Sequence, residues 1–272
     1  MNLSKLVTEF TLRPFPLWNN EVVNHLVADK MENLSLPYSL TNCILKESVE
    51  SEITRLLPTD QLTIVLPSID LQYFYQDHGL NPLSADDSFD DAIKQVQRAL
   101  DIFKQIPAVH TFVISIVKSI QLLKTDDPET DMSYSHPDIP FSIFVSVCEN
   151  NSSICNLRVA ESILHEAMHL ELTLMEDVLE MVNPKSKDVY YSPWRGEERP
   201  LRGVLHGLYV FTAILDFYAA LIKITSDESL TAYLRKRIEI IKEEFTMLHE
   251  FPKSPGLTPS GRNLATNILH GR

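Results

Sequence analysis

The chain has 272 residues, of which 44% are hydrophobic and 22% are charged, and its net charge is −13. A chain of this length and composition can bury a sizeable core, as one large domain or two modest ones, and long disordered stretches are not expected. The acidic balance, without a run of Lys and Arg among aromatic residues, excludes the electrostatic pattern of nucleic-acid and anionic-membrane binding. Small molecules and peptides are the partners that this composition favours.

The sequence predicts a cytoplasmic protein that does not bind a membrane. No segment approaches the ~20 apolar residues of a membrane span, and Glu9 and Arg13 lie where a secretory signal has its apolar core. Three cysteines, Cys43, Cys148 and Cys155, cannot make a disulfide framework, and the last two are interpreted as small core residues. With seven glycines and no glycine-rich phosphate-binding motif, no nucleotide cradle is expected.

The residue pattern predicts a mainly helical fold with a few short β-strands. The composition changes near residue 85, which indicates an N-terminal subdomain over 1–85, not necessarily independent, and a helical domain over 86–272 that carries the candidate site. A first strand is expected at 62–66. Apolar residues three and four positions apart predict a helix over 87–106 and a second helix over 107–123, which meet at a proline.

The second half of the chain is expected to be helical around one further strand. β-Branched and aromatic residues predict a strand over 141–147, directly before a long helix over 156–182 that ends at a proline. Another helix is predicted from Pro200 onward, where a proline suits the first turn. Ser226 is placed to cap the N-terminus of a later helix with an apolar stripe.

The helix predicted over 156–182 contains the sequence His165-Glu166-x-x-His169. Residues four apart project from one face of a helix, about 6 Å apart along its axis. Two imidazoles so placed can bind one divalent ion, and Glu166 lies close enough to hold a water or a ligand. The alternative is a pair of core histidines satisfied by hydrogen bonds, but a metal is the simplest partner that both could share.

His206, 37 residues beyond His169, is the candidate for a third ligand. Zinc peptidases of the metzincin class need a glycine and a histidine where this chain has Leu172 and Met175. Those of the thermolysin class need a Glu roughly twenty residues beyond His169, where only Asp188 is available. Glu176 lies seven residues past His169, about 10 Å farther along the axis, and is assigned to the surface or to a supporting role. Gly203 and Gly207 flank His206, and small residues at this spacing permit another helix to approach. The alternative for His206 is a lone core histidine.

Three arginines precede or flank this candidate ligand: Arg195, Arg199 and Arg202. Arg202 lies one helical turn before His206, so both point toward the same region. An arginine beside a metal can hold a carboxylate through two hydrogen bonds. The alternative for all three is ion pairing with local acids, such as those at 197–198.

Three segments, 133–148, 160–176 and 190–211, together resemble a known family: H-E-x-x-H-containing peptide-modification proteins encoded near ribosomally made peptide precursors. Members are described as 2-oxoglutarate-dependent peptide β-hydroxylases. The resemblance implies an Fe(II) site held by His165, His169 and His206. Because this set departs from the two-histidine, one-carboxylate triad of most non-haem oxygenases, Glu166 is left open between ligand and supporting residue.

The resemblance also implies the cosubstrate and the substrate. An arginine, Arg202 or else Arg195 or Arg199, would anchor the distal carboxylate of 2-oxoglutarate, and Tyr209 is expected beside it. The substrate would be a ribosomal precursor peptide, hydroxylated at a side-chain carbon with 2-oxoglutarate and O₂ as co-reactants. The strand over 141–147 is expected to hold this peptide, with three residues lining its path: His136, Ser142 and Phe144.

Two other functions compete with this one. In a zinc metallopeptidase, Glu166 would be the general base that acts on zinc-bound water, and Tyr190, Tyr191 or Tyr209 could stabilise the oxyanion. Three arginines near the third ligand exceed what that chemistry needs and suit a dicarboxylate. A metal-stabilised binding module without turnover is the third possibility, and the intact Glu166 argues against it.

Overall fold

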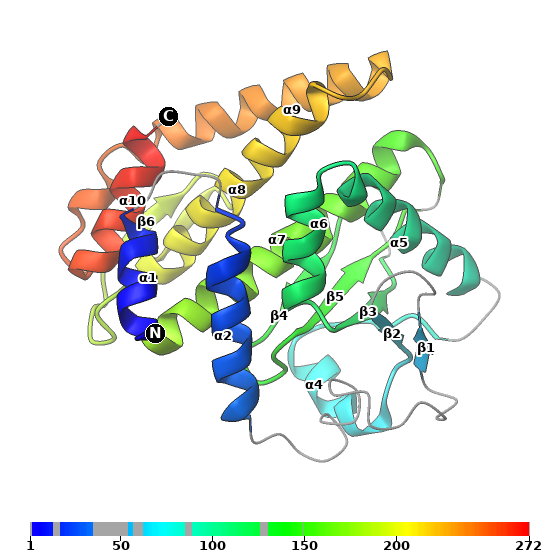
Figure 1. Cartoon of the computed structure of the whole chain (residues 1–272), viewed down its shortest axis with the longest axis horizontal. Coiled ribbons are helices and arrows are strands. Elements are labelled where there is room, and N and C mark those ends of the chain that lie inside the picture. The colour runs from blue at the N-terminus through cyan, green and yellow to red at the C-terminus, as the bar shows by residue number, and fades with distance from the viewer. Residues whose placement is uncertain are drawn as a thin grey trace. The chain divides into compact units, whose positions relative to one another are not determined.

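The structure is a computed structural model that describes residues 2–12, 17–34, 54–56, 62–84, 89–125, 130–148 and 150–271. The chain forms two compact units. One comprises Met31–Leu170, and the other comprises Met1–Lys30 together with Glu171–Arg272. The division expected between residues 85 and 86 falls within 85–88, outside the described residues. The expectation of a mainly helical chain with a few short strands is confirmed (Figure 1).

The unit of residues 31–170 contains a five-stranded sheet with the strand order β1-β2-β3-β5-β4. Its inner strands β2, β3 and β5 are parallel to one another, whereas β1 and β4 are antiparallel to their neighbours. The strands predicted at 62–66 and 141–147 are confirmed as β2 and β5. The strand bounds are β1 Thr54–Leu56, β2 Thr63–Val65, β3 Ser119–Leu123, β4 Ser133–Ser135 and β5 Ser142–Ser146.

The predicted pair of helices on either side of a proline is confirmed, except at its end. Helix α5 (Phe89–Lys104) is followed by α6 (Pro107–Ile116), with Pro107 in the first turn of α6. The expected continuation of α6 to residue 123 is wrong, because 119–123 is strand β3 between β2 and β5. Every residue of β3 is buried. A short apolar segment that is buried on both faces fits helical and extended spacing equally well.

Two helices cover opposite faces of this sheet (Figure 1). Helix α4 (Gln72–Asp77), preceded by the 3-10 turn η1 (Ile69–Leu71), packs Tyr75 against Phe144 of β5 within a small apolar cluster. Tyr134 of β4 is the cross-strand partner of Phe144 and packs against the same cluster. Because side chains alternate along a strand, Ser133 and Ser135 face the other side of the sheet, where α7 (Ser153–Val178) lies.

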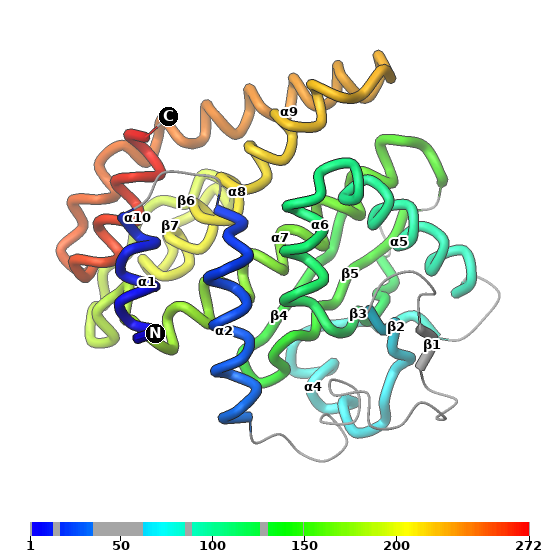
Figure 2. The backbone as a smooth tube through the Cα atoms, in the orientation of Figure 1, coloured from blue at the N-terminus to red at the C-terminus, as the bar shows by residue number. Residues whose placement is uncertain are grey.

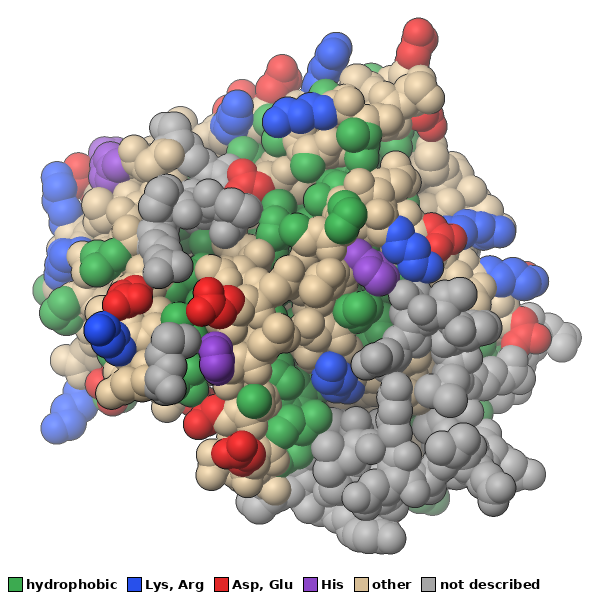
Figure 3. Space-filling view, viewed as in Figure 1, with side chains coloured by type: hydrophobic (Ala, Val, Ile, Leu, Met, Phe, Trp, Pro, Cys, Tyr) green, Lys and Arg blue, Asp and Glu red, His purple; other side chains and the backbone are tan. Residues whose placement is uncertain are grey.

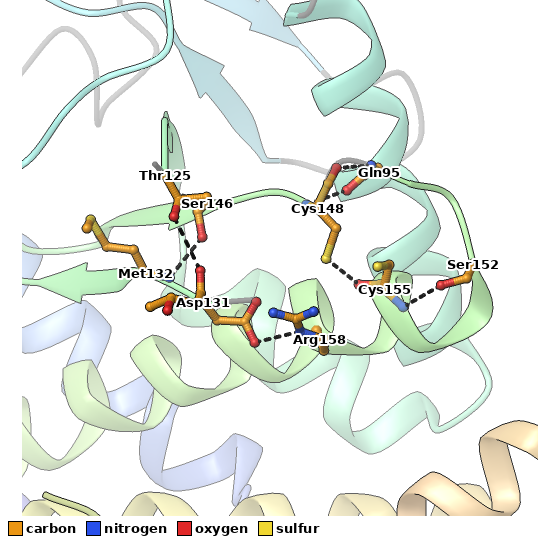
Figure 4. Close-up of polar contacts among 10 residues, drawn as sticks. Gln95, Thr125, Asp131, Met132, Ser146, Cys148, Ser152, Cys155 and Arg158 are labelled. Atoms are coloured by element: carbon orange, nitrogen blue, oxygen red, sulfur yellow. Dashed lines mark hydrogen bonds and ion pairs between the residues drawn. The ribbon is translucent and has the colours of Figure 1, made fainter. Parts of the chain in front are cut away.

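The connection from β5 to α7 is held by several polar contacts (Figure 4). The Gln95 side chain of α5 makes two hydrogen bonds to the backbone of Cys148. Its Nε2 donates to the Cys148 carbonyl at 2.6 Å, and its Oε1 accepts from the Cys148 amide at 3.0 Å. Cys148 and Cys155 are both buried, as predicted, and both are free thiols. Burial and the neighbouring Cys155 raise the pKa of the Cys148 thiol to about 12, so it is an unreactive core residue. Cys43 lies outside the described residues.

The other unit is built around α8 (Leu201–Ile222). Helix α1 (Leu3–Thr11) lies beside α10 (Pro259–His270) (Figure 2), and Asn267 donates a 2.6 Å hydrogen bond to the Thr11 carbonyl. A hairpin of β6 (Val189–Ser192) and β7 (Glu197–Pro200) precedes α8 directly. The remaining elements are α2 (Asn20–Glu32), α9 (Glu228–Thr246) and the 3-10 turn η2 (Phe251–Lys253).

The capping residue of α9 differs from the prediction by one position. Asp227, rather than Ser226, is the N-cap, and its carboxylate accepts hydrogen bonds from the amides of Ser229 and Leu230. A carboxylate also interacts favourably with the positive end of the helix dipole, which explains why it takes this place in preference to the serine.

Helix α8 is long and apolar enough to cross a membrane by length and composition alone. Most of it is buried within its own unit, as in the core helix of many proteins that span no membrane. On the face drawn in Figure 3, acidic and basic side chains are interspersed over the described residues. Neither the burial of α8 nor these charges test the cytoplasmic location, which stays a prediction.

Candidate functional site

Helix α7 carries the H-E-x-x-H motif within the unit of residues 31–170. The Ser152 hydroxyl oxygen accepts a hydrogen bond from the Cys155 amide, 3.2 Å away, as an N-cap does, so the helix begins three residues before the predicted start. His165 and His169 lie one turn apart, and their Nε2 atoms approach to 3.1 Å. The two rings are nearly perpendicular, with an interplanar angle of 69°.

The separation of these two Nε2 atoms fits a shared metal ion. Two nitrogen ligands at ~2.1 Å from one ion, at angles between tetrahedral and octahedral, lie about 3.0–3.4 Å apart. The observed 3.1 Å falls in that interval. The alternative to a shared ion is a direct hydrogen bond between the rings. It requires that one Nε2 carries a hydrogen and donates while the other Nε2 is unprotonated and accepts. The pair could therefore hold a divalent ion without rearrangement of the helix.

Glu166 is buried, with only 3% of its surface exposed, and both of its carboxylate oxygens are hydrogen-bonded. The Ser133 hydroxyl donates to Oε1 at 2.7 Å, and the Ser135 hydroxyl donates to Oε2 at 2.6 Å. Oε1 lies 4.0 Å from Nε2 of His165, which places the carboxylate beside the histidine pair but outside hydrogen-bonding distance of it. Sequence reasoning missed both serines, although a Ser-x-Ser pattern on one face of a strand was visible.

A second polar cluster, formed by Glu176, His206 and Arg202, lies in the other unit. Oε2 of Glu176 is 3.0 Å from Nε2 of His206 and 2.7 Å from Nε of Arg202. Nη2 of Arg202 also reaches the Thr173 hydroxyl at 3.4 Å. His206 is therefore buried and is not a lone core histidine, because it contacts the Glu176 carboxylate. Arg202 pairs with Glu176, whereas the alternative considered from the sequence was a pairing with the acids at 197–198.

Glu176 was assigned from the sequence to the surface or to a supporting role. The surface assignment is wrong, because its side chain is only 14% exposed. Burial alone would raise the pKa of this carboxyl, but the hydrogen bond and charge of His206, together with Arg202, lower it overall. Glu176 is consequently an ionised partner for both neighbours. The Arg202 side chain remains 51% exposed, so its outer edge is accessible to a further anion.

The two glycines of α8 accommodate a hairpin side chain and not another helix, contrary to expectation. A Cβ atom at Gly207 would lie 2.5 Å from the Trp194 ring, whereas one at Gly203 would meet nothing closer than 3.7 Å. Trp194, in the β6–β7 turn, stacks on Phe211 with ring centroids 5.0 Å apart. Its buried Nε1 has no hydrogen-bond partner among the described residues.

Tyr209 lies fully buried in the core of its unit, where its hydroxyl donates to Oε2 of Glu171 at 2.7 Å. The other Glu171 oxygen is buried without a partner in the described part of the chain. Burial raises the pKa of Glu171 to about 8, and the Tyr209 hydrogen bond opposes that shift only partly. The structure thus gives Tyr209 a core partner that sequence analysis did not foresee. A buried acid among leucines on α7 was the available signal.

The other two arginines lie at the hairpin before α8. Arg195 is exposed in the turn between β6 and β7, and Arg199 is half-buried on β7. The Arg199 side chain passes beside Gly203, 3.7 Å from where a Cβ atom would stand. All three candidate arginines thus belong to the same unit as His206.

The residues expected to line the peptide path differ in their exposure. Ser142 and Phe144 are buried, and Ser142 bonds the Ser119 hydroxyl at 2.6 Å. The substrate chain cannot pair with β5 as a further strand, because β3 and β4 already pair with its two edges. His136, just after β4, is partly exposed and packs against the rings of Phe74 and His78. Burial lowers its pKa, so it is mainly neutral near pH 7.

Among the described residues, no group of three or more His, Cys, Asp or Glu side chains is placed to hold a metal ion. The His165–His169 pair is therefore the part of the predicted ligand set that the structure brings together. Comparison of the sequence with models of known protein families and with curated proteins finds no match to either.

Proposed function

We propose that the chain is an Fe(II)- and 2-oxoglutarate-dependent hydroxylase that acts on a side-chain carbon of a ribosomally made precursor peptide. The observation that carries the metal part of this proposal is the 3.1 Å separation of the His165 and His169 Nε2 atoms, which matches the spacing of two ligands on one ion. The oxidative part rests on the family resemblance of the sequence and on the arginines around His206.

In this proposal, His165 and His169 hold the metal, and His206 is the third ligand on the strength of the sequence alone. Bound Fe(II) would let O₂ oxidise both the peptide and 2-oxoglutarate, with one oxygen atom entering the C–OH group of the peptide and the other entering succinate as CO₂ is lost. Glu166, fixed by two hydroxyl groups, provides a buried acceptor beside the histidine pair. The protein thus contributes position and charge, and the cofactor contributes the oxidation.

Arg202 is the arginine best suited to anchor the distal carboxylate of 2-oxoglutarate. Its Nε is oriented by Glu176, while half of its side chain remains exposed to an arriving anion. A guanidinium held on one edge can still bind a carboxylate on its outer edge through charge-assisted hydrogen bonds. Arg195 and Arg199 are the remaining candidates, and their positive charge would attract a dicarboxylate to this unit.

A zinc metallopeptidase is the second candidate, because Glu166 lies one residue from a metal-binding histidine, as a general base would. Its hydrogen bonds argue against that role. A general base must take a proton from metal-bound water and pass it on, whereas the two hydroxyl hydrogen bonds hold the Glu166 carboxylate in one orientation. Such an arrangement suits a fixed acceptor better than a group that shuttles a proton.

One experiment separates the two reactions. Purified protein is loaded with Fe(II) without oxygen, then given 2-oxoglutarate and O₂, with and without a ribosomally made precursor peptide, and succinate is measured. We expect succinate from the unaltered protein and none from His165→Ala, while His249→Ala, which changes an exposed histidine, behaves as the unaltered protein does. If no succinate forms and zinc-loaded protein cleaves the peptide, the peptidase is correct and the hydroxylase is not.

A further inference from the structure

Strand β4 delivers two hydroxyl groups to a single buried carboxylate. Ser133 and Ser135 each donate to a different oxygen of Glu166, at 2.7 and 2.6 Å. Bonds of this length from a hydroxyl to a carboxylate belong to the stronger hydrogen bonds of proteins. With both oxygens engaged, the Glu166 side chain is restrained to one orientation.

The register of β4 is fixed independently of these two bonds. Tyr134, between the serines, points to the opposite face of the sheet, where its ring lies 6.3 Å from Phe144 and 6.4 Å from Phe74. A shift of the strand by one residue would therefore place the tyrosine on α7 and the serines in the apolar cluster. The alternation of polar and aromatic side chains holds the two hydroxyls where Glu166 needs them.

The segment before β4 is also attached to α7. Asp131 accepts a 2.9 Å hydrogen bond from Nε of Arg158, two helical turns before Glu166, in an ion pair where Arg158 is only 14% exposed (Figure 4). Met132 is bonded to Ser146 of β5 through its amide and its carbonyl, at 2.9 and 2.8 Å. These contacts anchor β4 between the helix and the sheet, so the serines are rigid donors.

We propose that Ser133 and Ser135 are positioning residues that hold Glu166 beside the metal pair and keep it from turning into the coordination sphere. This inference rests on the proposed function, because it requires a metal at His165 and His169. With Oε1 held 4.0 Å from Nε2 of His165, the carboxylate is placed to accept a hydrogen bond from a water on the metal. Glu166 is then a supporting residue and not a ligand.

Cobalt(II) is the probe that tests this, since its visible absorption responds to the ligands around it. The test compares Ser133→Ala/Ser135→Ala with Ser133→Thr/Ser135→Thr, which keeps both hydroxyls. We expect the visible spectrum of the alanine variant to change and its Co(II) affinity to rise about tenfold, because the freed Glu166 carboxylate can then enter the coordination sphere as an additional ligand. The threonine variant should keep the spectrum of the unaltered protein, and Ser119→Ala, a buried serine on β3, serves as the matched control.

Each outcome decides the inference. An alanine variant that stays folded by circular dichroism, with the spectrum and Co(II) affinity of the unaltered protein, would overturn it, and so would a threonine variant whose spectrum and affinity change as much as those of the alanine variant. If the double alanine variant does not fold, Ser133→Ala and Ser135→Ala are measured singly against the same criteria. Absence of Co(II) binding by the unaltered protein would instead reject the proposed function, and this inference with it.

Discussion

At the scale of single residues, Glu176 is the side chain that links two of the predicted site residues, His206 and Arg202. Glu176 accepts from both His206 and Arg202, so one carboxylate orients two residues that the sequence assigned to metal and cosubstrate. The sequence could identify His206 and Arg202 from their spacing on one helix. It could not identify Glu176 as their partner, because that contact joins positions 26 and 30 residues apart.

Substitution of Arg202 tests its assignment to the cosubstrate. We expect Arg202→Ala to raise the 2-oxoglutarate concentration for half-saturation at least tenfold, because a hydrogen-bonded charge pair contributes about 1.5–3 kcal/mol. Metal affinity should be unchanged, and Arg235→Ala, an exposed arginine on α9, should leave both quantities unchanged. The measurement is an anaerobic 2-oxoglutarate titration of the Fe(II)-loaded protein.

A second variant shows whether Arg202 acts directly. Glu176→Gln removes the charge that orients Arg202 but leaves the guanidinium in place, so its effect on 2-oxoglutarate affinity should be smaller than that of Arg202→Ala. Equal effects would mean that Arg202 serves mainly to neutralise Glu176. An unchanged affinity in Arg202→Ala would remove this arginine from the cosubstrate site.

At the scale of elements, the β6–β7 hairpin packs on α8 through the ring of Trp194, which lies against Gly207. Trp194 occupies the space that a side chain at Gly207 would need, and it stacks on Phe211 one turn further along the helix. The hairpin carries Arg195 and Arg199, so this contact also sets where those charges lie.

The hairpin contact predicts opposite effects for two identical substitutions. We expect Gly207→Ala to lower the free energy of unfolding by about 1–3 kcal/mol, because its Cβ would overlap the Trp194 ring. Gly203→Ala, whose Cβ would make only ordinary van der Waals contact with Arg199, should be neutral or stabilise by up to about 1 kcal/mol, since alanine favours a helix. Urea unfolding measures both, and equal stability of the two variants would contradict this packing.

The elements also show where sequence periodicity succeeds and where it cannot decide. The start of α6 followed from Pro107, and β5 followed from its β-branched and aromatic residues. Strand β3 was mistaken for helix because Ile116, Ile120 and Leu123 keep a three- and four-residue spacing into a strand that is buried on both faces. Only the pairing of β3 with β2 and β5, which is a long-range contact, determines its conformation.

At the scale of the whole molecule, the mainly helical class followed from composition and periodicity, but the division of the chain did not. The two units interleave in sequence, since residues 1–30 join 171–272, and α7 contributes residues 153–170 to one unit and 171–178 to the other. Local patterns carry no signal for such an arrangement, because a continuous helix shows no break where its packing partners change. The motif helix was nevertheless recognisable from its spacing alone.

The central claim is that His165 and His169 hold a metal ion to which 2-oxoglutarate binds. The most direct test is a titration of Fe(II) and 2-oxoglutarate without oxygen, followed by the visible charge-transfer absorption that their chelate gives. We expect this band in the unaltered protein and in His249→Ala, and its loss in His165→Ala and in His169→Ala. A protein that takes up Fe(II) equally well without either histidine, or that gives no band with 2-oxoglutarate, would contradict the account.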